Sequence, residues 1–482
     1  MEYPAIIQGG MGLGISNWRL AHSVAQAGQV GVVSGTCIDL IMQRRLQDGD
    51  ADGSMRRGLA AFPDQDMASR VRQRWFIPGG RTAEQAYQAK GMVGHEPSDD
   101  SLELLIVASF VEVHLAKTGH DQRIGINFLN KIQPPLLASI YGAMLAGVDI
   151  IIVGAGIPFE IPALISKLQQ HQAAEWKLQV AEAPRSSNYQ LCFDPARHMT
   201  VFPEIERPLF FPIVSSAALA GLLVKKSAGG VDGLIVEHHS AGGHNAPPRG
   251  QRELNAAGEP IYGERDAIDL EAIAAFELPF WLAGSYGTPE QLRTALAAGA
   301  QGVQVGTLFA FCEESGLRDD LKRQVIDACL DGTPPPVYTS PVASPTGFPF
   351  KIPQVPGTLS DADLYAKRKR VCDLGYLREA YAREDGSIGW RCASEPIAQY
   401  ERNNGSAENC HGRQCLCNAL MANIGLGQRL GNDAEELPLL TCCDQVADIV
   451  NIIPQDGQSY TTAQVVEYLL SSMSTFRHPV TT

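Results

Sequence analysis

Residues 280–307 read FWLAGSYGTPEQLRTALAAGAQGVQVGT, in which one segment of helical length separates two short apolar runs. The first run, residues 280–283, has the length of a strand, and Thr288 then offers a hydroxyl that can cap a helix over residues 289–298. A second apolar run follows at residues 302–305. Two strands joined by one helix form a βαβ unit, so this stretch predicts a parallel sheet with helical crossovers.

The same alternation of apolar runs and helical segments extends through the first 330 residues. Eight runs are predicted as strands, at residues 5–8, 30–35, 123–128, 149–153, 210–215, 233–237, 280–283 and 302–305. Further helices are predicted at about residues 17–27, 102–117, 135–146 and 217–228. This α/β pattern matches a TIM-type (β/α)8 barrel better than an open doubly wound sheet.

Two regions depart from the alternation. Residues 39–100, after the second strand, have mixed charge and scattered Gly and Pro, and they predict an insertion on the barrel. A Pro-rich linker at residues 334–356 then leads into helical pieces and loops. We therefore expect a barrel of residues 1–330, with the insertion at about residues 39–100, followed by a mainly helical, cysteine-containing C-terminal appendage of residues 331–482.

The formal charge of the 482-residue chain is −14, which disfavours binding to nucleic acid and to anionic membranes. Apolar stretches such as residues 150–153 are far shorter than the ~20 residues that span a bilayer. No secretory signal is recognisable, and a cytoplasmic protein is expected. The one basic run, Lys367 to Arg370, is predicted to be a solvated helix face.

The cysteines are concentrated towards the end of the chain. Of 11 cysteines, the last quarter holds Cys372, Cys392, Cys410, Cys415, Cys417, Cys442 and Cys443. Thiolates at such spacing could hold Zn²⁺ or an iron–sulfur cluster, but no paired C-x₂-C motif is present and buried free thiols are common core residues. Both interpretations stay open, and no metal ligand is assigned.

Glycine turns follow several of the predicted strands. Gly284-Ser285 and Gly306-Thr307 follow the seventh and eighth strands, whose loops build the usual phosphate site of a TIM barrel. The glycines at residues 10, 12 and 14 resemble a dinucleotide fingerprint, but residues 32–35 supply no acidic residue after the second strand. We therefore expect a turn that lets the backbone approach a flat ligand closely.

A histidine-rich turn, EHHSAGGH at residues 237–244, follows the sixth strand. The carboxyl ends of barrel strands carry the active sites of these folds, and paired glycines let the chain turn sharply. An imidazole at this position suits proton transfer near neutral pH. His244 is therefore the candidate catalytic residue, although a Gly-Gly-His sequence by itself is also common in structural turns.

Three motifs, in their order and spacing, resemble the nitronate monooxygenase (2-nitropropane dioxygenase) family: PAIIQGGMG at residues 4–12, AGGH at residues 241–244 and VGTLF at residues 305–309. That family consists of FMN-binding TIM barrels and is similar to the flavin enoyl reductases of fatty-acid and polyketide synthesis. The resemblance covers about residues 4–330.

The resemblance implies FMN as the cofactor and His244 as the catalytic residue. Gly10 and Met11 would line the flavin ring, and Asn127 would reach it from the third strand. Glu237 would bind a ribityl hydroxyl or orient His238. The residues implied to surround the ribityl phosphate are Gly242, Gly243, Gly284, Ser285, Gly306 and Thr307.

The implied activity is oxidation of nitronates or nitroalkanes with O₂ to a carbonyl compound and nitrite. Many family members have Gln-Gly where Glu237-His238 stand here, and the reductase branch more often has an acidic residue there. An alternative is therefore an NAD(P)H-dependent enoyl reductase acting on acyl thioesters, with a carrier protein as partner. A non-catalytic flavin- or metal-binding accessory protein is a third reading.

A homo-oligomer is compatible with the sequence. Residues 39–100 and the C-terminal appendage are expected to form the pocket walls.

Overall fold

The structure is a computed structural model that describes residues 3–184, 186–251, 253–430, 434–454, 457 and 459–472. Eight parallel strands form its central sheet, in the order β1-β11-β10-β9-β8-β4-β3-β2. They are β1 (Ile6–Gln8), β2 (Gly31–Ser34), β3 (Ile124–Leu129), β4 (Ile150–Gly154), β8 (Leu209–Val214), β9 (Leu234–Glu237), β10 (Phe280–Ala283) and β11 (Gly302–Val305). A parallel bridge between Ile7 and Val30 joins the two outer strands and closes the barrel.

The predicted TIM-type barrel is therefore confirmed, with a structural strand at each of the eight predicted runs. Its interior is filled by apolar side chains from alternate strand positions, as expected of a barrel of this size. These side chains include Ile7, Val32, Ile152, Phe211 and Trp281, all of which are fully buried. The barrel is thus a packed core, and its ligand site must lie at one end.

Helices cover the outside of the barrel. They include α1 (Trp18–Gln26), α6 (Leu136–Leu145), α7 (Ile161–Gln169), α8 (Ala217–Lys226), α9 (Leu270–Ala274), α10 (Pro289–Ala297) and α12 (Asp319–Leu330). The short α11 (Thr307–Ala310) follows β11 directly and is buried. The predicted cap of α10 is present, because the Thr288 hydroxyl accepts the Gln291 N–H while the Gln291 side chain accepts the Thr288 N–H. Asn17 caps α1 in the same position.

The stretch after β2 is more helical than its sequence suggested. It contains α2 (Ile38–Gln47), α3 (Ser54–Ala61) and α4 (Gln65–Trp75), which pack against the long α5 (Asp99–Lys117). Between β4 and β8 lie the antiparallel pair β5 (Ala174–Lys177) and β7 (Gln190–Phe193) and the short β6 (Val180–Ala181), which pairs in parallel with residues 380–381 of the C-terminal segment. None of the described helices is long and apolar enough to cross a membrane.

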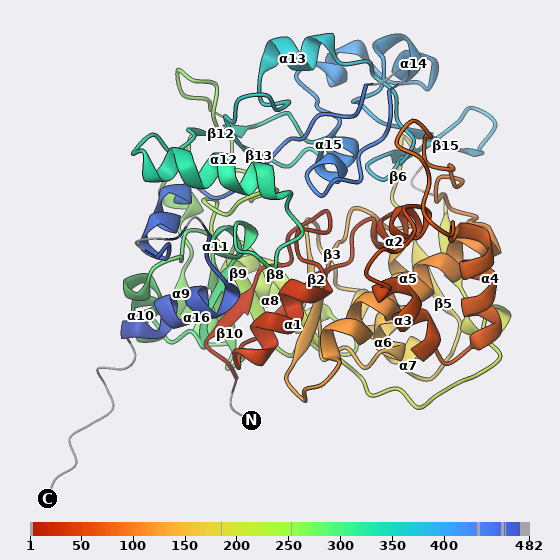
Figure 1. Cartoon of the computed structure of the whole chain (residues 1–482), viewed down its shortest axis with the longest axis horizontal. Helices are drawn as coiled ribbons and strands as arrows, with labels where there is room; N and C mark the ends of the chain where they lie inside the picture. Colours follow the sequence, from red (N-terminus) through yellow and green to blue (C-terminus); the bar gives the residue numbers. More distant parts are fainter. Residues whose placement is uncertain are drawn as a thin grey trace, which may run out of the picture.

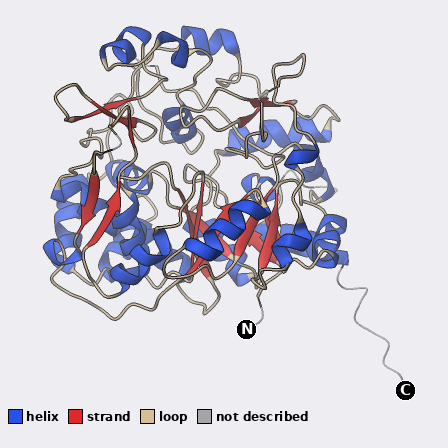
Figure 2. Cartoon of the chain, turned by 180° about the vertical axis from the view of Figure 1, so that it is seen from behind, coloured by secondary structure: helices blue, strands red, loops and turns tan. Residues whose placement is uncertain are grey.

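The C-terminal segment, residues 331–472, lies over one end of the barrel (Figure 1). It combines helices with two short antiparallel strand pairs: β12 (Val337–Ser340) with β13 (Phe350–Pro353), and β14 (Glu379–Ala382) with β15 (Ile388–Arg391). Figure 2 shows these short strands in the half of the molecule opposite the barrel strands. The helices of the C-terminal segment are α13 (Ala362–Lys367), α14 (Ile397–Arg402), α15 (Leu416–Ala422) and α16 (Thr462–Leu470).

The last helix, α16, returns to the barrel and packs against α1 and α10 (Figure 1). Residues from the end of the chain thus complete the outer ring of helices. The division at residue 330 into a barrel and an appendage stays a prediction. The predicted solvated face at residues 367–370 is wrong for Arg368, whose side chain is 3% exposed and paired with Glu436.

Candidate functional site

A cavity of about 420 Å³ opens at the carboxyl ends of the barrel strands. Its volume lies in the range of small-molecule and cofactor sites. The cavity is lined by every site residue predicted from the sequence: Gly10, Met11, Asn127, Glu237, Gly242, Gly243, His244, Gly284, Ser285, Gly306 and Thr307. The structure therefore brings together residues from β1, β3, β9, β10 and β11 and from the turns that follow them.

The turn after β1 packs closely against β3. A Cβ atom on Gly10 would lie 2.3 Å from the Asn127 Cβ, so only glycine allows this approach. The Met11 N–H donates to Ser16 Oγ at 2.8 Å, which fixes the turn. The Met11 side chain lies beside Gly306, because a Cβ on Gly306 would be 3.5 Å from its sulfur. The first and last strands thus share one wall of the cavity.

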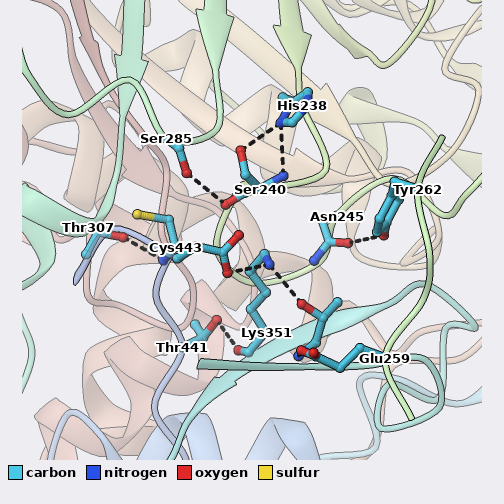
Figure 3. A network of polar contacts seen from close by, with 12 residues as sticks. His238, Ser240, Asn245, Glu259, Tyr262, Ser285, Thr307, Lys351, Thr441 and Cys443 are labelled. Atoms are coloured by element: carbon cyan, nitrogen blue, oxygen red, sulfur yellow. Dashed lines mark hydrogen bonds and ion pairs between the residues drawn. The ribbon is translucent and has the colours of Figure 1, made fainter. Parts of the chain in front are cut away.

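The turns after β9 and β10 are also in close contact. Gly284 has φ of +95°, and a Cβ there would lie 2.8 Å from the His238 carbonyl oxygen. Ser285 adopts a left-handed φ of +55°, and its Oγ reaches the Ser240 carbonyl oxygen at 3.5 Å (Figure 3). Such backbone conformations are uncommon outside glycine and occur where a binding site constrains the chain.

Two of the predicted phosphate-binding residues also hold the C-terminal segment. The Gly243 N–H donates to Thr441 Oγ1 at 2.7 Å. The Cys443 N–H donates to Thr307 Oγ1 at 2.9 Å (Figure 3). The Gly243 N–H is therefore engaged by protein. Sequence reasoning missed Thr441 and Cys443, since neither stands in a recognisable motif.

Lys351 extends this network on the other side of the turn. Its backbone N–H donates to the Gly243 carbonyl oxygen at 3.1 Å, and its own carbonyl oxygen accepts the Thr441 hydroxyl at 2.7 Å. Its buried ammonium group donates to Asp444 at 2.6 Å and to Thr339 at 2.8 Å (Figure 3). The glycine turn is thus clamped between β13 and residues 441–444.

His244 lies against β13. Its Nε2 is 2.6 Å from the hydroxyl of Ser344, which is fully buried and in turn lies 2.8 Å from Thr346 Oγ1. The imidazole packs edge-on to the Phe350 ring, with 5.0 Å between ring centroids. Burial lowers the pKa of His244 to about 4, so the ring is neutral at neutral pH and can accept a proton.

Glu237 ends β9 at the edge of the same cavity. Burial raises the pKa of its carboxyl group to about 8, which favours the protonated form at neutral pH. The His238 ring is held by Ser240, whose Oγ lies 2.8 Å from Nδ1. Burial, together with the nearby His238, lowers the pKa of His239 to about 4, and its ring stacks on Tyr262 at 3.8 Å.

The walls of the cavity are largely apolar. The C-terminal segment contributes part of them, as predicted, but residues 39–100 contribute no lining residue within the described chain, so that part of the prediction is wrong. No lysine or arginine is found among the described lining residues. Large apolar side chains on the walls are Leu13, Ile132, Phe348, Phe350, Leu377 and Leu420.

The raised pKa of Glu237 predicts a pH-dependent stability. Between its ordinary pKa of 4.5 and about 8, the carboxyl group stays protonated in the folded chain but ionises in the unfolded chain. Its stabilising contribution is therefore complete below about pH 4.5 and is lost as the pH rises to about 8. A Glu237→Gln variant, which cannot ionise, is expected to gain in Tm relative to wild type as the pH rises through this window. Thermal melting of flavin-free protein measures the difference.

The exposed Glu271, replaced by glutamine in the same way, is the control. Its Tm difference from wild type should be nearly independent of pH. Equal pH slopes for wild type and Glu237→Gln would show that Glu237 ionises normally in the folded chain.

The cavity also fits a flat, phosphorylated cofactor. Gly10, Gly284 and Gly306 leave its floor without Cβ atoms, so the backbone can approach a ring system or an anion closely. The hydroxyl groups of Ser285 and Thr307 lie in the turns after β10 and β11, next to Gly284 and Gly306. These residues come from the strands whose loops bind phosphate in TIM barrels, so they fit FMN.

The barrel and its cavity define a TIM-type α/β fold with the ligand site at the carboxyl ends of the strands. The model of the family described as nitronate monooxygenase matches residues 158–342 of this chain. The predicted resemblance to that family is therefore confirmed.

Two curated relatives and one solved structure are also similar. A probable nitronate monooxygenase of Bacillus subtilis is 33% identical over 99 residues, which cover 20% of this chain and 27% of that protein. A (3aS,4S,5R,7aS)-5-hydroxy-7a-methyl-1-oxo-octahydro-1H-indene-4-carboxyl-CoA dehydrogenase of Mycobacterium tuberculosis is 31% identical over 121 residues, which cover 25% of this chain and 31% of that protein. FabK from Thermotoga maritima has 14% identity and a TM-score of 0.49, with 98% of this chain and 94% of that one covered. The chain spans about a third of the length of the curated relatives that it matches.

Proposed function

We propose that this chain is an FMN-dependent oxidoreductase that oxidises nitroalkanes or nitronates with O₂ to a carbonyl compound and nitrite. The observation that carries the proposal is the meeting of all eleven predicted site residues around one cavity, with a neutral imidazole among them. The family match over residues 158–342 supports the same activity. A net charge of −14 and eleven free cysteines fit a cytoplasmic enzyme that acts on a small molecule.

In this proposal Gly10, Met11 and Asn127 contact the flavin ring. Residues of the β9, β10 and β11 turns hold the ribityl phosphate, with Ser285 and Thr307 supplying hydroxyl groups. Bound FMN supplies the redox chemistry, because it can take electrons from an organic substrate and pass them to O₂. Glu237, protonated at neutral pH, is placed to donate a hydrogen bond to a neighbouring hydroxyl or carbonyl oxygen.

His244 acts on the substrate. Its neutral imidazole removes the α-carbon proton of a nitroalkane, and the Ser344 hydroxyl holds the ring in position. The apolar walls exclude water from the reacting carbon. Because no cationic side chain is found among the described lining residues, the neutral nitroalkane should enter this cavity more readily than the anionic nitronate.

One observation favours a second candidate, an NAD(P)H-dependent enoyl reductase. The cavity wall formed by the C-terminal segment carries Leu377 and Leu420, and no charged side chain of that segment lines the cavity among the described residues. The acyl chain of an unsaturated thioester is uncharged and apolar, and it would fit such a wall. In this alternative a carrier protein is the partner that delivers the substrate.

Cofactor analysis and two activity assays test the proposal. Denaturation of the purified full-length chain should release FMN, because the two glycine turns form a single-phosphate site without a dinucleotide fingerprint. Incubation with nitroethane and O₂ should release nitrite. Recovery of FAD, or of no flavin after mild purification, would contradict FMN binding. NAD(P)H oxidation with an enoyl thioester, without nitrite release from nitroethane, would replace the first candidate with the second.

A further inference from the structure

A second cavity, of about 390 Å³, lies in the C-terminal segment. It is lined by four of the eleven cysteines: Cys372, Cys392, Cys415 and Cys417. They come from three places in the sequence, namely the loop after α13, the residue after β15 and the start of α15. All four are free thiols, so the fold brings four thiols from separate parts of the sequence into the lining of one cavity.

The sulfur atoms of this cavity are surrounded by hydrogen-bond donors. Cys372 and Cys415 form a side-chain hydrogen bond with each other, and the Gly375 N–H donates to Cys372 Sγ at 3.3 Å. Backbone N–H groups of residues 376 and 377 hydrogen-bond to Cys417. The side-chain amide of Asn418 donates to Cys415 Sγ at 3.8 Å. Hydrogen bonds to sulfur also tune the properties of metal clusters that thiolates ligate.

Cationic side chains line the same cavity. Arg368 is neutralised by Glu436, but neither Arg370 nor Arg378 forms an ion pair within the described residues. The Arg378 guanidinium donates to the carbonyl oxygens of Gly375 and Val93, and it lies over the Trp390 ring. Glu395 lines the same cavity and attracts the Arg378 charge, but the described lining still holds three arginines and one carboxylate. The cavity therefore suits an anionic occupant.

The arrangement of the thiols distinguishes between two kinds of metal centre. A single zinc ion needs its thiolates at about 2.3 Å, so the ligands must crowd around one point. No group of three or more His, Cys, Asp or Glu side chains is placed in this way in the described part of the chain. An iron–sulfur cluster has an inorganic core of several atoms, and its four thiolates stand around a hollow instead.

We propose that Cys372, Cys392, Cys415 and Cys417 bind an iron–sulfur cluster in this cavity. Four thiolates give such a cluster a net negative charge, which Arg370 and Arg378 are placed to offset. The hollow, the four free thiols and the donors around them are then explained together.

The proposed cluster would lie next to the barrel cavity, because Tyr376, Leu377 and Cys417 line both cavities. A cluster in this position is a one-electron carrier separated from the barrel cavity by one layer of residues. Exchange of electrons between the cluster and a flavin rests on the proposed function, whereas binding of the cluster does not.

Anaerobic purification of the full chain, followed by iron and acid-labile sulfide analysis, tests the proposal. Equal amounts of iron and sulfide are expected, about two or about four of each per chain, together with an electron paramagnetic resonance signal after reduction. Chemical reconstitution with Fe²⁺ and sulfide covers the case in which the cluster is lost during purification. Single Cys392→Ser and Cys417→Ser variants should bind markedly less iron and sulfide than wild type.

Cys410→Ser is the matched control, since Cys410 is buried nearby against Ala393 and Tyr400 but does not line the cavity. It should keep the iron and sulfide content of wild type. A reconstituted protein without iron or sulfide, a protein with zinc alone, or a Cys372–Cys415 disulfide that persists under anaerobic purification would each overturn the proposal.

Flavin content, measured on the same samples, separates this proposal from the proposed function. Iron and sulfide without FMN would support the cluster site and contradict the flavin site. FMN without iron or sulfide, after reconstitution, would support the flavin site and contradict the cluster site.

Discussion

Replacing His244 with asparagine is expected to lower kcat/KM for a neutral nitroalkane by about 10²–10⁴-fold, the usual effect of losing a positioned base. The imidazole is neutral at neutral pH because burial lowers its pKa to about 4, so it can take the α-carbon proton. A preformed nitronate has already lost that proton and should be affected much less. The FMN content should remain that of wild type, because in the proposed site the phosphate is held by glycines and hydroxyl groups of the β9, β10 and β11 turns and not by the His244 ring.

Ser344→Ala is the companion variant for a positioning role. It keeps the imidazole but removes the hydroxyl 2.6 Å from Nε2. A smaller loss in kcat is expected than in His244→Asn. The acid limb of the pH–rate profile is expected near pH 4 in wild type, because burial lowers the pKa of His244, and it should move in Ser344→Ala and disappear in His244→Asn. Full activity of His244→Asn on both substrate forms would reduce His244 to a turn residue.

The eight barrel strands were predictable because most of their residues are apolar. Both faces of a parallel strand are covered in such a fold, so hydrophobicity alone marks it. Helix α2 was missed because its buried face includes polar residues. Arg44, for example, is buried on α2 and donates to Asp373 and to the Leu426 carbonyl oxygen, far away in the sequence. No local pattern reveals such partners.

Part of the candidate site could be predicted from the sequence, and part could not. Its barrel side was predictable, because turns after parallel strands meet at one end of the sheet. Ser344, Lys351 and Thr441 come from the C-terminal segment, and each contacts the 243–244 turn from about 100 or more residues away in the sequence. Isolated Ser, Lys and Thr residues carry no such signal in the sequence. Only the fold shows that the C-terminal segment holds the 243–244 turn.

Glu436→Gln is expected to destabilise the folded chain by about 3–5 kcal/mol, the usual cost of breaking a buried ion pair. The Glu436 carboxylate accepts from Arg368 Nε at 2.5 Å and from Nη2 at 2.7 Å, and it also accepts the Gln428 side-chain amide at 2.7 Å. The two charged side chains are 3% and 0% exposed. Without the carboxylate, Arg368 is left as a buried cation with no compensating charge. Urea denaturation and thermal melting measure the loss.

The exposed pair of Arg293 and Glu290 on α10 gives the control for this prediction. Its side chains are 53% and 68% exposed, and Glu290→Gln should cost no more than about 1 kcal/mol, because water already screens the charges. A double replacement, Arg368→Met with Glu436→Leu, should recover much of the loss, since it leaves no unpaired charge. A single variant Glu436→Gln that is as stable as Glu290→Gln would show that the Arg368 charge finds another partner. A double variant less stable than the single one would show that the pair is needed for packing rather than for charge balance.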